Sequence, residues 1–203
     1  MKNLSPIDFE DFFIRTYFGE FEDYIDASIR RAYLDFNRTL HGMAGLERRE
    51  ELFEESRKFL RSKIDSLKDK DIDLTEFDQW HYQACMGLKQ IYTTYSYTFN
   101  IGQAQKWINM TLKYMFALRE ERVGGYTEVY QFCHIPIDNI ILDKFRKYNM
   151  PKFFNCKWSR INDYQMEYLS FQKWIRSTFP QFIPLELEFL LWLNKDNQKV
   201  GIL

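Results

Sequence analysis

The sequence of 203 residues is poor in the features that mark disulfide-linked, metal-binding and membrane proteins. Its three cysteines, Cys85, Cys133 and Cys156, include no C-x-x-C pair, which argues against a disulfide framework, a structural zinc site and an all-cysteine iron–sulfur cluster. No run of about 18 apolar residues is present, and the acidic first twenty residues lack the pattern of a signal peptide. We therefore expect a cytoplasmic protein with no membrane span, no metal and no cofactor.

The common catalytic signatures are also missing. The sequence contains no G-x-x-x-x-G-K, G-x-G-x-x-G, H-E-x-x-H or G-x-S-x-G motif, which disfavours P-loop, dinucleotide-binding, zinc-protease and serine-hydrolase chemistry. The three histidines, His41, His81 and His134, are far apart, and none has a second ligand at helical spacing. We interpret each as a structural or surface residue.

What the chain does have is apolar and aromatic material at helical spacing. Hydrophobic residues make up 45% of the sequence and aromatic residues 18%, which is enough for a buried core and excludes global disorder. The periodicity is helical almost throughout and predicts an all-α fold of about eight helices. Expected helices include residues 6–19, 21–41, 46–68, 76–95, 159–179 and 186–193. Ser5 and Asp8 are expected to cap the start of the first of these helices, and Thr75 and Asp78 the start of the fourth. We expect one compact domain over 1–203, with possible lobes formed by 1–75 plus the C-terminal helices and by 76–160.

Charge is divided unevenly along the chain. Residues 1–100 carry a net charge of −5 and residues 101–203 a net charge of +4. The basic half contains a stretch without acidic residues in which Lys144, Lys147, Lys152 and Lys157 alternate with aromatic residues. Such a stretch suits a phosphate backbone with bases to stack on, and the four lysines are candidate DNA contacts. A solvated surface with core aromatic residues behind it gives the same pattern.

Two segments stand out as candidates for chemistry. The first, residues 100–107, places a glycine turn at a helix start with Lys106 on the first turns, away from the apolar stripe. The second, residues 134–139, places Asp138 at the start of another helix. A carboxylate there is stabilised by free backbone N–H groups and by the helix dipole.

Together, Gly102-Gln-Ala-Gln-Lys106 and Ile135-Pro-Ile-Asp138 resemble the helix-hairpin-helix DNA glycosylases, and their separation is closest to the archaeal 8-oxoguanine glycosylase branch. The resemblance covers about residues 100–145. It implies that Lys106 is the nucleophile and Asp138 the catalytic carboxylate of a glycosylase/lyase that acts on an extruded, damaged or modified base of DNA. It also implies a helical fold of this family's type and a hairpin that grips a phosphate, formed by Asn100, Gly102, Gln103 and Ala104. Ala104 departs from the pattern, which has a second glycine there. For stacking on the extruded base, the candidates are Trp80, Tyr97 and Trp107.

Simpler interpretations compete with this one. Asp138 alone is typical of an N-cap, and Lys106 alone is typical of a solvated helix lysine. The alternatives at the level of function are a non-catalytic interaction protein, for example in phage–host conflict, and a DNA-binding scaffold without chemistry. The enzyme hypothesis requires the Lys106 amine and the Asp138 carboxylate to meet in one cleft.

Overall fold

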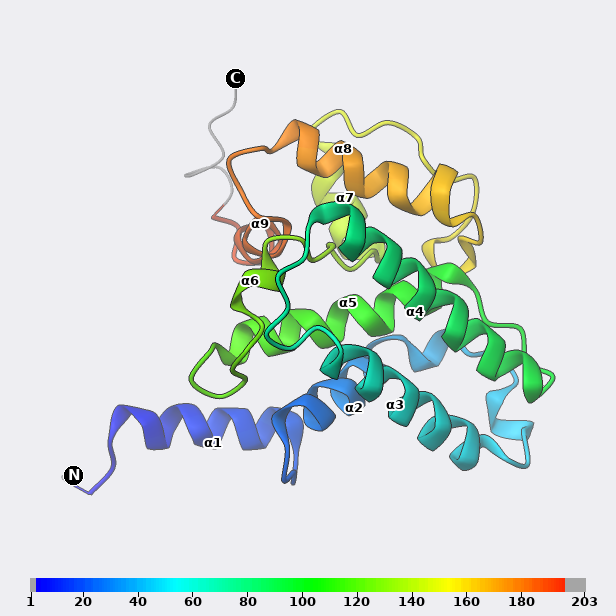
Figure 1. Ribbon diagram of the computed structural model, residues 1–203. Coiled ribbons are helices and arrows are strands. Elements are labelled where there is room, and N and C mark those ends of the chain that lie inside the picture. The colour runs from blue at the N-terminus through cyan, green and yellow to red at the C-terminus, as the bar shows by residue number, and fades with distance from the viewer. Residues whose placement is uncertain (1–2, 196–203) are drawn as a thin grey trace.

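The protein is all-α, as a computed structural model that describes residues 3–195 shows (Figure 1). No strand occurs in that range. The α-helices are α1 (Pro6–Phe18), α2 (Tyr24–Phe36), α3 (Arg49–Asp65), α4 (Leu74–Thr94), α5 (Ile101–Leu118), α6 (Thr127–Tyr130), α7 (Asn139–Arg146), α8 (Ser170–Thr178) and α9 (Pro184–Trp192). Short 3₁₀ turns lie at η1 (Asn37–Thr39), η2 (Met43–Gly45) and η3 (Trp158–Arg160), and η4 (Tyr164–Leu169) is a π-helix.

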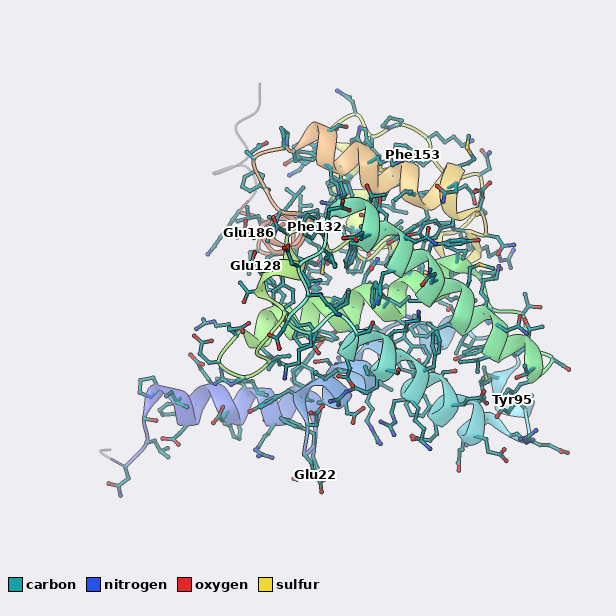
Figure 2. All side chains as sticks on the ribbon, in the orientation of Figure 1. Glu22, Tyr95, Glu128, Phe132, Phe153 and Glu186 are labelled. Carbon is teal, nitrogen blue, oxygen red and sulfur yellow. The ribbon has the colours of Figure 1, made fainter. Side chains whose placement is uncertain are left out.

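Helix α5 runs through the centre of the molecule, with α2, α4 and η3 packed around it (Figure 1). Nearly every residue of α5 is buried, polar ones included. A helix enclosed on all sides is expected to be apolar all round, so the buried polar residues of α5 need partners inside the protein. Side chains fill the space between the helices (Figure 2). Buried apolar residues from α2 to α9 form one continuous core, and the division into lobes stays a prediction.

Side-chain caps explain where several helices begin. The capping box predicted at Ser5 and Asp8 is present: the Ser5 N–H donates to Asp8, and the Asp8 N–H donates to the Ser5 hydroxyl. The capping pair expected at Thr75 and Asp78 is wrong. Asp73 and Glu76 form the box instead, which starts α4 two residues earlier.

The single helix expected over 159–179 is interrupted. The structure has η3, an extended link, the π-helix η4 and then α8. The Tyr168 N–H donates to the carbonyl of Asp163, five residues earlier, so the chain enters through a wide turn. Tyr164 and Tyr168 both point into the core from this turn.

Helix α1 stands apart from the rest of the fold. None of its residues is buried, and it extends from the body at the N-terminal end of the chain (Figure 1). Arg122, from the loop after α5, forms ion pairs with Glu10 and Asp11 of α1, at 3.2 and 3.0 Å. Within residues 3–195, the helices lack the combined length and hydropathy that crossing a bilayer requires.

Candidate active site

Lys106 and Asp138, 32 residues apart in sequence, form an ion pair at the surface of a cavity. The distance from Lys106 Nζ to Asp138 Oδ2 is 2.6 Å. The lysine side chain is 5% exposed and the aspartate side chain 18% exposed. The pair is therefore largely removed from water, and its electrostatic attraction is correspondingly less screened.

The two oxygens of Asp138 have different partners. Oδ2 accepts from Lys106, and Oδ1 accepts from the backbone N–H of Ile141 at 2.8 Å, which makes Asp138 the N-cap of α7. The cap fixes the carboxylate in place, because its rotation would break the bond to Ile141. The N-cap interpretation of Asp138 is correct, and it does not compete with contact to Lys106.

One face of α5 supplies more of the cavity lining than any other element. Lys106, Met110, Lys113, Tyr114 and Ala117 recur at helical spacing along this face. The cavity measures about 470 Å³, within the range of pockets that enclose a small ligand. Its other walls come from α1, α2, η1, the start of α7 and α9; they are Ile14, Tyr17, Phe18, Asp35, Arg38, Ile140, Phe189 and Trp192.

A second ion pair lies beside the first. Lys113 Nζ donates to Glu188 Oε1 at 2.7 Å, and the indole N–H of Trp192 donates to the same oxygen at 3.1 Å. Glu188 is 1% exposed, and its Oε2 has no hydrogen-bond partner within the described residues. Burial raises the pKa of Glu188, and Lys113 opposes this. Two lysines and two carboxylates thus form one compact group.

Two tyrosine hydroxyl groups and a carboxylate form a hydrogen-bonded chain in another part of the lining. Tyr114 donates its hydroxyl hydrogen to Asp35 at 2.6 Å. Because that hydrogen is used, Tyr17 donates to the Tyr114 oxygen, at 2.9 Å. Burial raises the pKa of Tyr114 far above its ordinary value, so the hydroxyl stays protonated. The chain joins α1 to α5 and α2.

In the turn expected to grip a phosphate, the backbone amides of Gly102 and Ala104 are already hydrogen-bonded within the protein. The Gly102 N–H donates to the carbonyl of Ile161 at 2.9 Å, and the Ala104 N–H donates to that of Asn100. The side chain of Gln103 accepts from the Asn100 N–H and donates to the carbonyl of Thr39. The Gly102 amide is thus bonded within the protein, because η3 and the residue after it cover this helix end, and the phosphate-gripping role of the turn stays a prediction.

None of the three aromatic residues expected to stack on a base borders the cavity. Trp107 is fully buried, lies parallel to Phe53 and donates its indole N–H to the carbonyl of Ile29. Trp80 lines a separate groove of about 710 Å³ along α4, and the Tyr97 hydroxyl donates to the carbonyl of His41. Tyr17, Phe18, Tyr114, Phe189 and Trp192 are the aromatic residues at the cavity.

The four lysines of the basic stretch also lie outside the cavity lining. Lys144 bonds to Asn194, two residues after α9. Lys152 and Lys157 are exposed on the segment between α7 and η3. Phe153 of that segment packs on Trp174 of α8, and it lies near α8, far from α1, in Figure 2. No DNA surface continuous with the cavity follows from these four residues.

Two of the histidines belong to a buried polar network. His134 Nε2 is 2.8 Å from a carboxylate oxygen of Asp78, which accepts only, so this nitrogen carries the hydrogen. His134 Nδ1 then accepts from the Tyr168 hydroxyl at 2.9 Å, and Asn109 donates to the Tyr168 oxygen. His81 lies 2.9 Å from the Asn109 carbonyl oxygen. The network gives the polar residues of α5 their partners.

The histidines of this network do not form a metal-binding site with other described residues. Within residues 3–195, no group of three or more histidine, cysteine or acidic side chains is placed to hold a metal ion. Burial lowers the pKa of both His81 and His134, which keeps them neutral and suited to a structural role.

Sequence reasoning did not predict that Lys113 pairs with Glu188, nor which aromatic residues line the cavity. Lys113 and Tyr114 follow Lys106 on the same helix face, so the helical period was an available signal for them. No comparable signal exists for Tyr17 or Trp192, which reach the cavity from opposite ends of the described chain. Comparison with protein-family models, curated proteins and solved structures gives no significant match.

Proposed function

We propose that the protein is a lysine-dependent DNA glycosylase/lyase whose nucleophile is Lys106 and whose catalytic carboxylate is Asp138. One observation carries the proposal: the amine and the carboxylate lie 2.6 Å apart at the wall of a cavity of about 470 Å³. A lysine nucleophile needs a nearby group to accept its proton and a pocket that excludes water. Asp138, held by its capping bond, is placed to be that group.

The chemistry has two stages. Asp138 accepts the proton of Lys106, and the neutral amine attacks C1′ of a nucleotide swung out of the duplex. The C1′–N bond breaks, and the base leaves with the bonding electrons. The departing base takes up the proton held by Asp138, which is then ionised again. The C1′–O4′ bond of the sugar opens, O4′ takes the proton that the attacking nitrogen loses, and a Schiff base to Lys106 remains. Asp138 stabilises the positive charge of this Schiff base and accepts the C2′ proton, whose loss expels the 3′ phosphate and cleaves the strand.

The structural corrections change how DNA would be held. The Gly102 amide is bonded to Ile161, and the aromatic residues at the cavity come from α1, α5 and α9. A base entering the cavity would meet Tyr114, Phe189 and Trp192. Arg38 borders the cavity and has no ion-pair partner among the described residues, so it is the cation placed to meet a flanking phosphate.

Borohydride trapping tests the proposal directly. The full chain is incubated with duplex oligonucleotides that contain an abasic site or 8-oxoguanine, and sodium borohydride reduces any Schiff base to a stable adduct. We expect a covalent adduct with the natural chain, its loss in Lys106→Ala and Lys106→Gln, and its retention in Lys173→Gln, an exposed lysine of α8. Peptide mass mapping must place the adduct on residue 106. An adduct that persists in both Lys106 variants would refute the proposal, as would no adduct with any oligonucleotide.

A further inference from the structure

Helix α1 has apolar side chains on two opposite faces, and only one face meets the protein. Ile14 and Phe18 point toward the body and line the cavity. At about 100° per residue, Phe9, Phe12 and Phe13 lie on the other side of the helix. Their residues are 53, 64 and 68% exposed. An apolar face of a helix is normally covered, and within residues 3–195 nothing covers this one.

The exposed area is substantial for one helix. Taking 150–250 Å² for each aromatic side chain, Phe9, Phe12, Phe13 and the 47% exposed Tyr17 together expose about 500 Å². Leu4, 67% exposed, adds apolar surface just before the helix, whereas Ile7, 63% exposed, lies on the side of Ile14 and is not part of this face. A stable interface buries about 800 Å² per partner, so the rings of α1 alone supply more than half of that area.

The charged residues beside this face would complement the same residues on an antiparallel second copy of the helix. Asp8 and Arg15 are seven residues apart, so they lie two turns apart on the same flank of the aromatic stripe. Asp8 receives both bonds from Ser5 on Oδ2, which leaves Oδ1 for another partner. Arg15 makes no ion pair within residues 3–195 and rests over the ring of Phe21.

We propose that the outer face of α1 pairs with α1 of a second copy of this chain, antiparallel and related by a twofold axis. In that arrangement Asp8 of each copy faces Arg15 of the other, because the two positions are symmetric about the middle of the helix. Phe9 of each copy then lies against the small Thr16 of the other, and the two Phe12 rings meet near the axis. The chain's net charge of −1 opposes self-association very little.

Other occupants fit the face less well. An anionic lipid surface or a nucleic acid would meet Asp8 at the edge of this face, on a helix whose one cation is Arg15. Pairing with a second copy also has a consequence at the cavity. Tyr17 belongs both to the cavity wall and to the exposed face, so the second copy would hold that wall in place.

Sedimentation equilibrium of the full chain, at about 1 to 100 μM, tests the pairing. We expect a reversible dimer that Phe12→Asp dissociates and that Met166→Asp, a matched change at an exposed apolar site on η4, leaves intact. Arg15→Glu and Asp8→Lys should each weaken self-association by roughly 20-fold, since two attractive charge pairs become repulsive. Mixed in equal amounts, the two variants should form a heterodimer, because both charge pairs are then restored.

Arg15→Glu keeps the capping box at Ser5, and circular dichroism checks that Asp8→Lys keeps α1 helical. A chain that is monomeric at 100 μM would overturn the proposal, and so would a dimer that survives Phe12→Asp or a mixture that fails to pair. Binding of α1 to phosphatidylcholine/phosphatidylserine vesicles, lost in Phe12→Asp, would assign the face to lipid and also overturn it. None of these readouts depends on the chemistry at Lys106, so the two proposals fail separately.

Discussion

Substituting alanine for Gly102 is expected to destabilise the fold strongly. A Cβ atom at this position would lie 1.9 Å from the carbonyl oxygen of Trp158 and 2.9 Å from its carbonyl carbon. Both atoms belong to backbone, so no side-chain rotation can relieve the overlap. Helix α5 and η3 must separate, and that strains the hydrogen bond from the Gly102 N–H to the Ile161 carbonyl.

The magnitude follows from three contributions. Overpacking against rigid backbone costs about 3 kcal/mol at the upper end of its usual range. Loss of the hydrogen bond to Ile161 costs about 1 kcal/mol. Alanine recovers about 1 kcal/mol through its higher helix propensity. The net loss in the free energy of unfolding is therefore about 3 kcal/mol, which lowers the melting temperature by about 6 to 12 °C.

Urea denaturation followed by circular dichroism measures this loss, and Gly45→Ala is the matched control. A Cβ atom at Gly45 meets nothing within 4 Å, so that variant should stay within about 0.5 kcal/mol of the natural chain. A Gly102→Ala variant as stable as the natural chain would refute the packing explanation. If that variant also lost DNA binding, the turn would have the phosphate-gripping role that the sequence suggested.

Three further predictions concern the buried polar groups. Asp138→Asn keeps a side-chain oxygen for the cap but leaves the buried Lys106 without its carboxylate, so urea denaturation should show a loss of about 2 kcal/mol in the free energy of unfolding. The control, Asp143→Asn, removes an exposed ion pair on the same helix and should change that free energy by less than about 0.5 kcal/mol. The pKa of His81 is lowered by burial, so the unfolded chain takes up a proton below about pH 6.5 while the folded chain does not. Between pH 7.5 and 5, the free energy of unfolding of the natural chain should therefore fall by about 2 kcal/mol more than that of His81→Gln. Equal pH dependence of the two chains would contradict this. Trp107→Phe removes the indole bond to a backbone carbonyl in the core and should cost about 1 to 3 kcal/mol, measured by thermal unfolding.

The helix ends show how far local reasoning reaches. The Ser5 box and the Asp138 cap were predictable because a cap depends on residues three or four apart. The pair at Thr75 and Asp78 was wrong because Asp73 and Glu76 fit the same rule two residues earlier, and Asp78 instead accepts from the buried His134. The π-helix at Tyr164 had no recognisable signal, because its wide turn is decided by the packing of two tyrosines.

The sequence by itself determined the helical class of the protein, the position of Lys106 off the apolar stripe of its helix and the capping position of Asp138, because all three depend on neighbours within two turns. Only the tertiary structure decided that the two side chains touch, that Gly102 packs against backbone and that α1 keeps an uncovered aromatic face. Those outcomes depend on which distant helices meet α5, and the geometry of such contacts is not encoded in any short stretch of the chain.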